Sequence, residues 1–390
     1  MKSVQPNLHM PAEWEPHTST WLAWPHYRGD WPGKFEPIPW VYAESIRHLG
    51  RHERVDLIVT SKASEKQARK VLRKANALTK NVHFHRWPTN RVWTRDSGCT
   101  FVLCGEGALV REERKGRVLD VTRETSLSAM TWRFNAWAKY SNYQHDEKIG
   151  TRMAAAAHAS GIRPMHGKSR VVLEGGSIEV NGHGTLLTTE ECLLSKTQQR
   201  NPRMSRADYE KLFLDHLGVT NVIWLASGIA GDDTHGHVDD ISRFVSPGTV
   251  ITAVESDKND PNYEPLQENI RRLRTATDQD GKPLSIIELP MPGPVVFEGR
   301  RLPASYANFY IANGIVLVPV FNDPNDRFAL EIMAGQFPDR EVVGIYSGDL
   351  IWGFGAMHCM TQQQPAVKPQ LSVTTNSGHA NRKEVSAAGV

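Results

Sequence analysis

The chain has 390 residues, of which 39% are hydrophobic and 23% charged, as is typical of a globular protein with one large domain or two ordinary ones. A formal net charge of +3 is too small for a nucleic-acid-binding protein, and no basic cluster alternates with aromatic residues. The sequence has no run of about 18 apolar residues, so we predict no transmembrane helix. The first residues also lack the apolar core of a secretory signal. The four cysteines form no C-x-x-C pair, so we expect a reducing cytoplasm.

Residues 1–40 contain five of the eleven tryptophans, interleaved with prolines that preclude a long helix. Two interpretations stay open: a loop that buries its aromatic rings against the domain, or a lid that lends tryptophan faces to a cationic ligand. Residues 41–50 then look like the start of a helix and 55–59 like a strand. A helix over 62–78 and a second, parallel strand over 82–85 follow, so the chain opens as an α/β protein.

One plan recurs along the chain, in which a polar residue precedes an apolar run, a turn and a second strand. It predicts hairpins at 100–103 with 108–110, 178–180 with 185–188, 241–245 with 250–254, and 306–311 with 315–320, and a truncated copy at 355–359. Helical patterns, such as 203–217 and 264–277, lie between the copies. The polar anchors are Asp96, Glu174, Asp239, Asn308 and Cys359, and we expect repeated βαβ-type units that bring them to one centre.

The loop over residues 231–240 packs four aspartates and two histidines into ten residues. Carboxylates at this density repel one another, so each needs a partner, water or a ligand. In one interpretation His237 transfers protons and Asp239 binds a cation. In the other, His235, His237 and Asp239 bind zinc, because H-x-H-x-D is similar to the first half of a metallo-β-lactamase-type motif. Residue 240 is Asp, however, where that motif has His.

Cys359 follows His358 and lies among small residues that let the backbone approach a ligand, so it is a candidate nucleophile as well as a candidate buried thiol. Cys99, Cys104 and Cys192 lie in or beside apolar hairpins, and we expect them to be structural.

Asp96 follows Trp93 just before a strand. Together they suit a cationic ligand, because the carboxylate can balance its charge and the indole can contact its apolar stem. Asp96 could also form a surface ion pair with an arginine. Glu174 precedes Gly175 and Gly176, where it is either a turn residue or a group that orients a histidine.

Six stretches together resemble the agmatine deiminase family, also called the bacterial-type peptidyl-arginine deiminase family. The resemblance spans residues 10–365 in order. The stretches are Met10-Pro11-Ala12-Glu13-Trp14-Glu15-Pro16-His17, Trp93-Thr94-Arg95-Asp96-Ser97-Gly98, Phe134-Asn135-Ala136-Trp137, Leu173-Glu174-Gly175-Gly176, Gly236-His237-Val238-Asp239 and His358-Cys359-Met360-Thr361-Gln362-Gln363. The resemblance implies a pentein fold, a five-bladed α/β propeller with pseudo-fivefold symmetry and a central active-site channel. We expect one catalytic domain over residues 1–367 and a disordered tail over 368–390.

The resemblance also implies a reaction. Cys359 would attack the guanidinium carbon of agmatine, and His237 would act as general acid and base. Asp96 and Asp239 would hold the guanidinium nitrogens, and Glu174 would support the histidine. The products would be N-carbamoylputrescine and ammonia, formed through a covalent amidino-cysteine without metal or cofactor. We expect a homodimer or larger homo-oligomer that binds a small cationic guanidine and neither nucleic acid nor membrane.

The sequence departs from the family pattern beside these residues. Phe354 and Ala356 interrupt a glycine run, Cys99 stands where Pro is common, and His235 stands where Asp or Asn is usual. These departures leave the substrate tail open. Trp93, Asp232, Asp233 and His235 are candidates to contact it, and acidic residues suit the ammonium of agmatine. Peptidyl-arginine or free arginine as substrate, a zinc hydrolase, and a binding protein without turnover stay as alternatives.

Overall fold

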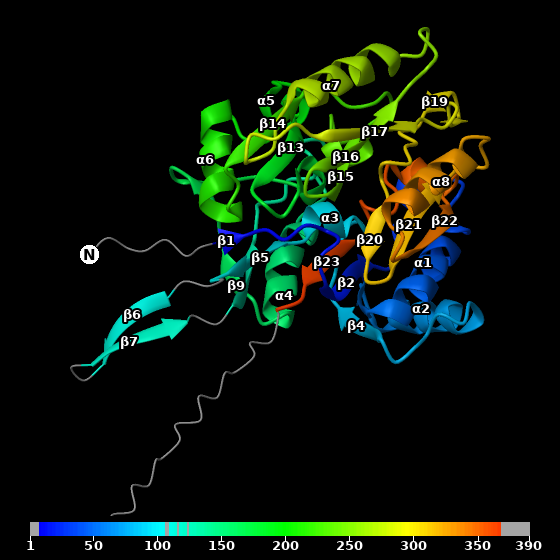
Figure 1. Ribbon diagram of the computed structural model, residues 1–390. Helices are drawn as coiled ribbons and strands as arrows, with labels where there is room; N and C mark the ends of the chain where they lie inside the picture. The colour runs from blue at the N-terminus through cyan, green and yellow to red at the C-terminus, as the bar shows by residue number, and fades with distance from the viewer. Residues whose placement is uncertain (1–7, 106–108, 115–116, 123–124, 368–390) are drawn as a thin grey trace, which may run out of the picture.

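A computed structural model describes residues 8–105, 109–114, 117–122 and 125–367. Within these residues, five sheets have three or four strands each (Figure 1). In strand order, the first sheet is β23 (Gln362–Pro365), β2 (His17–Ala23), β3 (Arg54–Val59) and β4 (Val82–Arg86), and the second is β1 (Leu8–His9), β5 (Thr100–Cys104), β8 (Ser126–Met130) and β9 (Ser160–Ile162). The third sheet is β12 (Glu179–Val180), β13 (Thr185–Thr189) and β14 (Asn221–Leu225), and the fourth is β15 (Ser242–Ser246), β16 (Thr249–Val254) and β17 (Ser285–Pro290). The fifth sheet is β20 (Tyr310–Ala312), β21 (Ile315–Val320) and β22 (Glu341–Tyr346).

All five sheets contain the same unit. An antiparallel pair is followed by a helical crossover to a strand that lies parallel to the second member of the pair. Parallel neighbours require such a crossover. The helices are α1 (Ile38–His52), α4 (Ile149–Ala156), α5 (Glu190–Leu194) with α6 (Arg206–Leu217), α7 (Tyr263–Thr275) and α8 (Asp326–Gln336); α2 (Lys62–Lys74) leads on to β4.

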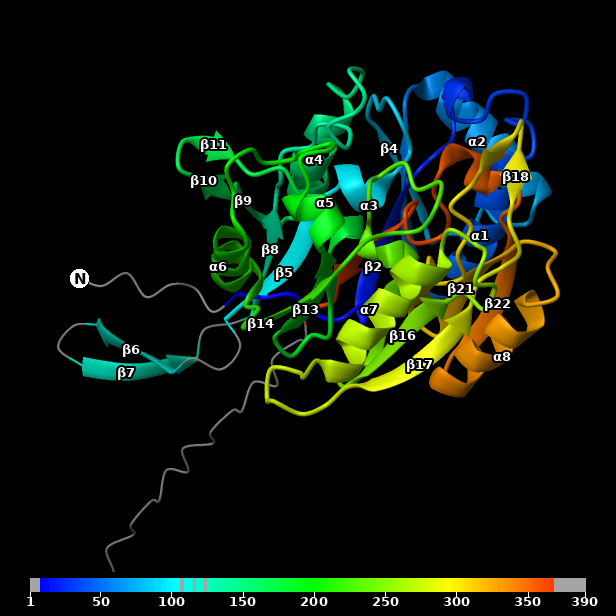
Figure 2. The same cartoon turned by 90° about the horizontal axis from the view of Figure 1, so that it is seen from above.

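Helices and strands join each sheet to the next. The helix α7 packs on β16 of its own sheet and on β14 of the preceding one, and α8 likewise joins β22 to β17 (Figure 2). The helix α1 contacts β3 and also β21, and β23 contacts β5. The helix α6 contacts β1, which joins the second sheet to the third. The sheets therefore form a closed ring of neighbours. The predicted α/β pentein class and its five repeated units are confirmed, while the pseudo-fivefold symmetry itself stays a prediction.

The ring closes through the two ends of the described chain. The strand β23 lies antiparallel to β2, with Trp21 opposite Gln362 (Figure 1). The predicted truncated copy at 355–359 is therefore wrong in one respect, because its second strand is supplied by the N-terminal segment rather than missing. The two strands are more than 300 residues apart in sequence, so no local pattern could reveal that they pair.

The predicted hairpin at 100–110 is also wrong. The strand β5 pairs with β1 and β8, whereas β6 (Leu109–Arg114) pairs with β7 (Arg117–Thr122). The turn predicted at 105–107 lies partly outside the described residues. The other three predicted hairpins are confirmed. Two further short hairpins are β10 (Met165–His166) with β11 (Ser169–Arg170), and β18 (Val296–Phe297) with β19 (Arg300–Arg301).

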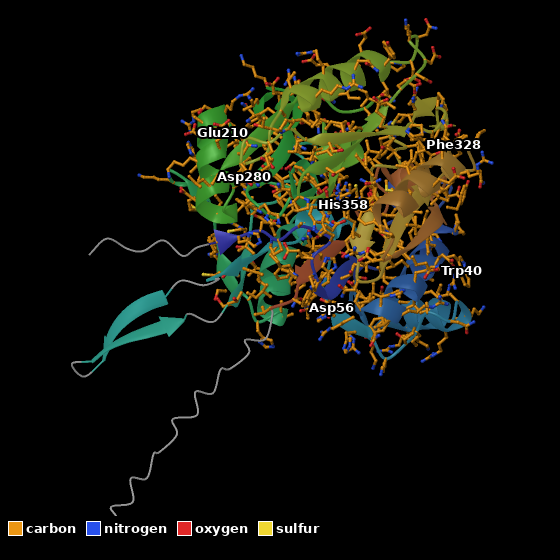
Figure 3. All side chains as sticks on the ribbon, in the orientation of Figure 1. Trp40, Asp56, Glu210, Asp280, Phe328 and His358 are labelled. Atoms are coloured by element: carbon orange, nitrogen blue, oxygen red, sulfur yellow. The ribbon has the colours of Figure 1, made fainter. Side chains whose placement is uncertain are left out.

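The N-terminal tryptophans belong largely to the core. Trp21, Trp24 and Trp31 are fully buried, and Trp40 lies on the outer surface of α1 (Figure 3). The interpretation as buried aromatics is confirmed, and these rings do not form a lid. The short helix η1 (Arg28–Asp30) of this segment instead brings Asp30 to a cavity described below.

No helix among the described residues is both long enough and apolar enough to span a bilayer. The tail predicted over 368–390 lies outside the described residues, and the division into one domain over 1–367 stays a prediction.

Candidate active site

A cavity of about 580 Å³ opens beside Cys359 and has the size of a typical small-molecule site. Its inner end is lined by Trp93, Asp96, Trp137 and Cys359. Its outer end is lined by polar and aromatic side chains, among them Tyr27, Asp30, Arg91, Tyr140, Asp233, Arg300, Trp352 and Phe354.

The five predicted anchors each stand just before the first strand of a sheet. Asp96 lies in α3 (Thr94–Ser97) before β5, and Glu174 precedes η3 (Gly175–Ser177) and β12. Asp239 lies in η4 (Val238–Asp240) before β15, while Asn308 and Cys359 precede β20 and β23. Because equivalent ends of the five units face one centre, residues far apart in sequence meet there. Their predicted convergence is confirmed by the contacts that follow.

Cys359 is buried, and its sulfur contacts two anchors. The Nδ2 of Asn308 donates to Sγ over 3.1 Å and to Oδ1 of Asp240 over 2.9 Å. The Oδ1 of Asn308 accepts from the backbone N–H of His358 and of Cys359. The sulfur also lies 3.6 Å from Oδ2 of Asp239. Asn308, to which the sequence assigned no chemical role, thus fixes both the sulfur and the loop that carries it.

His237 lies fully buried among three carboxylates. Its Nδ1 is 3.9 Å from one oxygen of Asp96 and 3.9 Å from one oxygen of Asp239. Its Nε2 is 3.8 Å from Oε2 of Glu174. Among the described residues, neither ring nitrogen has a hydrogen-bond partner, and the same holds for Oε2 of Glu174 and Oδ1 of Asp239. Buried polar atoms are nearly always satisfied, so this cluster is suited to a polar ligand.

Gly176 keeps the centre of this cluster open. A Cβ atom at Gly176 would lie 2.6 Å from Nδ1 of His237, 2.9 Å from Oδ2 of Asp239 and 3.0 Å from Oδ1 of Asp96. Any side chain here would fill the space between these groups. The backbone N–H of Gly176 donates to Oδ1 of Asp96 over 3.1 Å. The glycine pair after Glu174 is therefore required by the close approach of this backbone to the site.

Asp96 and Glu174 differ in their affinity for protons. Burial raises the pKa of Asp96 to about 6, against the opposing effect of the nearby His237. Burial acts in the same direction on Glu174, but Arg200 and His237 outweigh it and hold the pKa of Glu174 down to about 2. Burial would lower the pKa of His237, yet the neighbouring Asp96, Cys192 and Glu174 raise it well above its usual range. These neighbours therefore favour an imidazolium at His237.

The surroundings of Cys359 favour its neutral thiol form. Burial raises the pKa of its sulfur, and the neighbouring Asp239, Asp240 and Asp96 raise it further. A bound cation between the sulfur and these carboxylates would act in the opposite direction.

A second charge network behind the site was missed at the sequence level. One ring nitrogen of His358 lies 2.7 Å from Oδ2 of Asp239, and the other lies 2.9 Å from Oε2 of Glu13. The carboxylate of Glu13 also accepts hydrogen bonds from the guanidinium of Arg95 over 2.9 Å and from that of Arg243 over 2.8 Å. All five side chains are buried, and Figure 3 shows His358 near the middle of the fold. The signals were present: His358 adjoins Cys359, and Glu13 lies in a stretch of the resemblance.

Trp93 lines the cavity as predicted. Its neighbour Trp137, which the sequence analysis noted only as part of a motif, donates from Nε1 to Oδ2 of Asp96 over 2.9 Å. The two oxygens of Asp96 are therefore held by Trp137 and by the backbone of Gly176, which fixes the plane of the carboxylate.

Asp233 lies at the outer end of the cavity, as predicted for a residue that contacts the substrate tail. Its Oδ2 accepts from the hydroxyl of Tyr140 over 2.6 Å, and its Oδ1 pairs with Lys139 and with Arg300 at 3.3 Å.

Asp232 and His235 were also predicted to contact the substrate tail, but neither lines this cavity. Asp232 does not line the cavity, because its carboxylate accepts from the backbone N–H groups of Thr234, Gly236 and His237 and so shapes the loop. His235 has a left-handed backbone with φ of 65°. Its ring turns away from the cavity.

The ring of His235 contacts Ser195 over 3.2 Å and lies 3.4 Å from Glu191. The zinc set of His235, His237 and Asp239 therefore does not form. Among the described residues, the groups of three side chains close enough to hold a metal are Glu174, Cys192 and His237, and Asp239, Asp240 and Cys359.

Cys192, expected to be structural, is buried beside Glu174 and His237. Its role in the fold stays a prediction.

Comparisons with known proteins agree with this geometry. The model of the Porphyromonas-type peptidyl-arginine deiminase family matches residues 9–365. The agmatine deiminase of Ectopseudomonas mendocina (strain ymp) is 35% identical over 382 residues, which cover 92% of this chain and 96% of that protein. The solved structure of the agmatine deiminase of Enterococcus faecalis is 30% identical with a TM-score of 0.80, and the match covers 92% of this chain and 96% of that one.

A second solved structure is a cysteine-to-serine variant of the C. jejuni agmatine deiminase with substrate bound. It is 26% identical with a TM-score of 0.77, over 92% of this chain and 97% of that chain. From the arrangement of the five sheets, the buried cysteine–histidine–carboxylate cluster at their centre and these full-length matches, the chain belongs to the Porphyromonas-type peptidyl-arginine deiminase family.

Proposed function

We propose that this protein hydrolyses agmatine to N-carbamoylputrescine and ammonia. The observation that carries the proposal is the cluster of unpartnered buried atoms on Glu174, His237 and Asp239 beside the sulfur of Cys359. A planar guanidinium supplies N–H donors for such carboxylates and an electrophilic carbon for the thiol. The full-length similarity to agmatine deiminases from three organisms selects agmatine from the guanidine compounds.

Binding prepares both partners for reaction. Asp96 and Asp239 hold the guanidinium nitrogens and set the plane of the group against the sulfur. The added positive charge offsets the carboxylates that raise the pKa of Cys359, so the thiol releases its proton to solvent when the substrate is in place, because His237 already carries a proton of its own. The N–H donated by Asn308 then stabilises the thiolate.

The thiolate attacks the guanidinium carbon, and His237 gives a proton from Nδ1 to the departing nitrogen, which leaves as ammonia. Nδ1 is suited to this role because it faces Asp96 and Asp239. Nε2 keeps its proton toward Glu174, which the neighbouring Arg200 holds in the charged form.

The covalent amidino-cysteine is then hydrolysed. His237, now neutral, takes a proton from water, and the oxygen adds to the same carbon. The carbon–sulfur bond breaks, the thiolate leaves, and a urea group remains on the product.

The opposite end of agmatine carries an ammonium group, and Asp233 at the outer end of the cavity supplies a carboxylate for it. Assembly as a homodimer or larger oligomer and a cytoplasmic location stay predictions. Another guanidine compound, such as a peptidyl-arginine, is the alternative substrate, because the cavity is larger than agmatine, with nine non-hydrogen atoms, needs.

The direct test is incubation of the purified protein with agmatine, arginine and an arginine-containing peptide, with ammonia and ureido product measured. We expect turnover of agmatine and a loss of more than about 10⁴-fold in Cys359→Ala. Cys104→Ala, which removes a partly buried thiol at the end of β5, is the matched control and should keep its activity. Preferred turnover of the peptide, or activity that survives Cys359→Ala, would contradict the proposal.

A further inference from the structure

Arg300 bridges two features at the outer end of the cavity. It begins β19, and its side chain is 49% exposed. One guanidinium nitrogen lies 3.3 Å from Oδ1 of Asp233, and the guanidinium carbon lies 4.0 Å from the ring centre of Phe354. Arg300 thus places a positive charge on the carboxylate that the substrate ammonium would need.

Among the contacts of Asp233, the one with Arg300 is the easiest to break. Tyr140 donates to Oδ2 over 2.6 Å, and Lys139 forms a shorter contact with Oδ1 than Arg300 does. Both Tyr140 and Asp233 lie deeper than the half-exposed Arg300. A guanidinium near water with one long contact leaves at little cost, because solvent replaces what it loses.

Phe354 adopts a backbone conformation that its side chain disfavours. Its φ of 66° lies in the left-handed region, where a bulky residue is an outlier and glycine is at ease. The ring is nevertheless held in place, by Trp352 with ring centres 6.0 Å apart and by Arg300 on its face. Trp352 in turn packs on Phe297 of β18, in the hairpin that carries Arg300. Strain of this kind persists where the surroundings over-determine it, often at a functional site.

We propose that, before substrate binds, Arg300 occupies the position that the substrate ammonium takes, and that the ring of Phe354 holds Arg300 there. The proposal rests on the proposed function, in which Asp233 receives the ammonium of agmatine. Each ammonium-tailed substrate must then displace Arg300 from Asp233. A carboxylate-tailed guanidine would instead pair with Arg300. The pair therefore sets how strongly the enzyme distinguishes guanidines by the charge of their tails, without contact with the reacting atoms.

The test is the steady-state kinetics of Arg300→Gln and Phe354→Gly with agmatine. We expect each variant to lower KM about two- to fivefold with kcat nearly unchanged. Arg300→Gln removes the competing guanidinium, and Phe354→Gly removes the ring that holds this guanidinium beside Asp233. The double variant should show no further fall, because both changes act on the same contact. An unchanged or raised KM in Arg300→Gln, or additive effects in the double variant, would overturn the proposal.

Two controls separate occupation of the subsite from general repulsion between positive charges. Arg301→Gln removes an equal charge from the same hairpin, but Arg301 pairs with Asp260 outside the cavity, so KM should not change. Butylguanidine carries the guanidinium without the ammonium, and its KM should not respond to Arg300→Gln. If Arg300→Gln lowers the KM of butylguanidine as much as that of agmatine, Arg300 acts only through its long-range electrostatic field and the proposal is wrong.

Binding to the Cys359→Ala variant distinguishes this proposal from the proposed function. By calorimetry, adding Arg300→Gln should tighten agmatine and weaken 4-guanidinobutyrate, whose carboxylate loses its partner. Tighter agmatine binding without turnover by the wild-type protein would refute the reaction and keep the subsite. Turnover with an unaltered dissociation constant would refute the subsite alone, and no binding of agmatine to either protein would refute both.

Discussion

The inner and outer ends of the cavity are built on different principles. At the inner end, the charged groups are fully buried and each is carried by the residue or short helix that begins a sheet, as for Asp96, Glu174 and Asp239. At the outer end, Asp233 and Arg300 come from loops and a short hairpin, and Arg300 is half-exposed. Reactive geometry lies on rigid elements and tail recognition on adjustable ones. Changes at the two ends should therefore affect different kinetic constants.

The largest expected effect is at the inner end. Glu174→Gln removes the charge that faces Nε2 of His237, so the pKa of His237 falls and its supply of protons weakens. We expect kcat with agmatine to fall about 10²–10⁴-fold, with the ring signals of His237 titrating at lower pH by NMR. Glu190→Gln, at the partly exposed start of α5, should behave as wild type. An unaltered kcat in Glu174→Gln would remove Glu174 from the mechanism.

Beneath the inner end, Glu13→Gln should weaken the fold. Arg95, Arg243 and His358 all contact this buried carboxylate. Loss of its charge removes the counter-charge of Arg95 and leaves Arg243 with Glu179 alone. We expect the free energy of unfolding to drop by about 3–5 kcal/mol in urea titrations. Glu36→Gln breaks only the exposed pair with Arg28 and should have no measurable effect. Equal stability of the two variants would show that the network behind the site is dispensable.

At the outer end, Asp233→Asn should change binding without changing chemistry. The neutral amide cannot offset the ammonium of agmatine, so KM should rise about ten- to a hundredfold while kcat stays within about twofold. Asp339→Asn alters an exposed carboxylate and serves as the control for net charge. A fall in kcat equal to the rise in KM would mean that the two ends are coupled and do not affect separate kinetic constants.

The last effect is a dependence on pH set by Asp96 at the inner end. It must be separated from Asp30 at the outer end, where burial raises the pKa to about 7. Burial raises the pKa of Asp96 to about 6, so the carboxyl keeps its proton up to that pH and cannot balance the guanidinium below it. We expect kcat/KM to rise with pH and to level off above about 6, with a tenfold loss per unit below. Asp96→Asn should lower activity and remove the limb near pH 6, whereas a limb that remains near pH 7 would belong to Asp30. A limb near pH 4, typical of an exposed aspartate, would contradict the buried environment of Asp96.

Sequence reasoning succeeded where pattern and position are local. The hairpin at 241–254 follows from alternating apolar residues around a turn, and the convergence of Asp96, Glu174 and Asp239 follows from their repeated place before a strand. It failed where the outcome depends on contacts between distant segments. The partners of β5 and the pairing of β23 with β2 are set by the whole ring.

Backbone conformation also decided outcomes that composition could not. The left-handed conformation of His235 turns its ring toward Ser195 and Glu191, although its spacing from His237 suits a shared metal. Glu13 lies in a stretch of the resemblance, but its burial between Arg95 and Arg243 depends on segments that are distant in sequence.

The pairing of β23 with β2 has a consequence for synthesis of the protein. Cys359 stands immediately before the strand that the ribosome delivers last among the described ones, and that strand docks on the first tenth of the chain. A nascent or prematurely terminated polypeptide can form several of its sheets, yet it lacks Cys359 held in position at the centre of the ring. Reactivity toward guanidines therefore begins only after translation has passed residue 365 and the ring has closed.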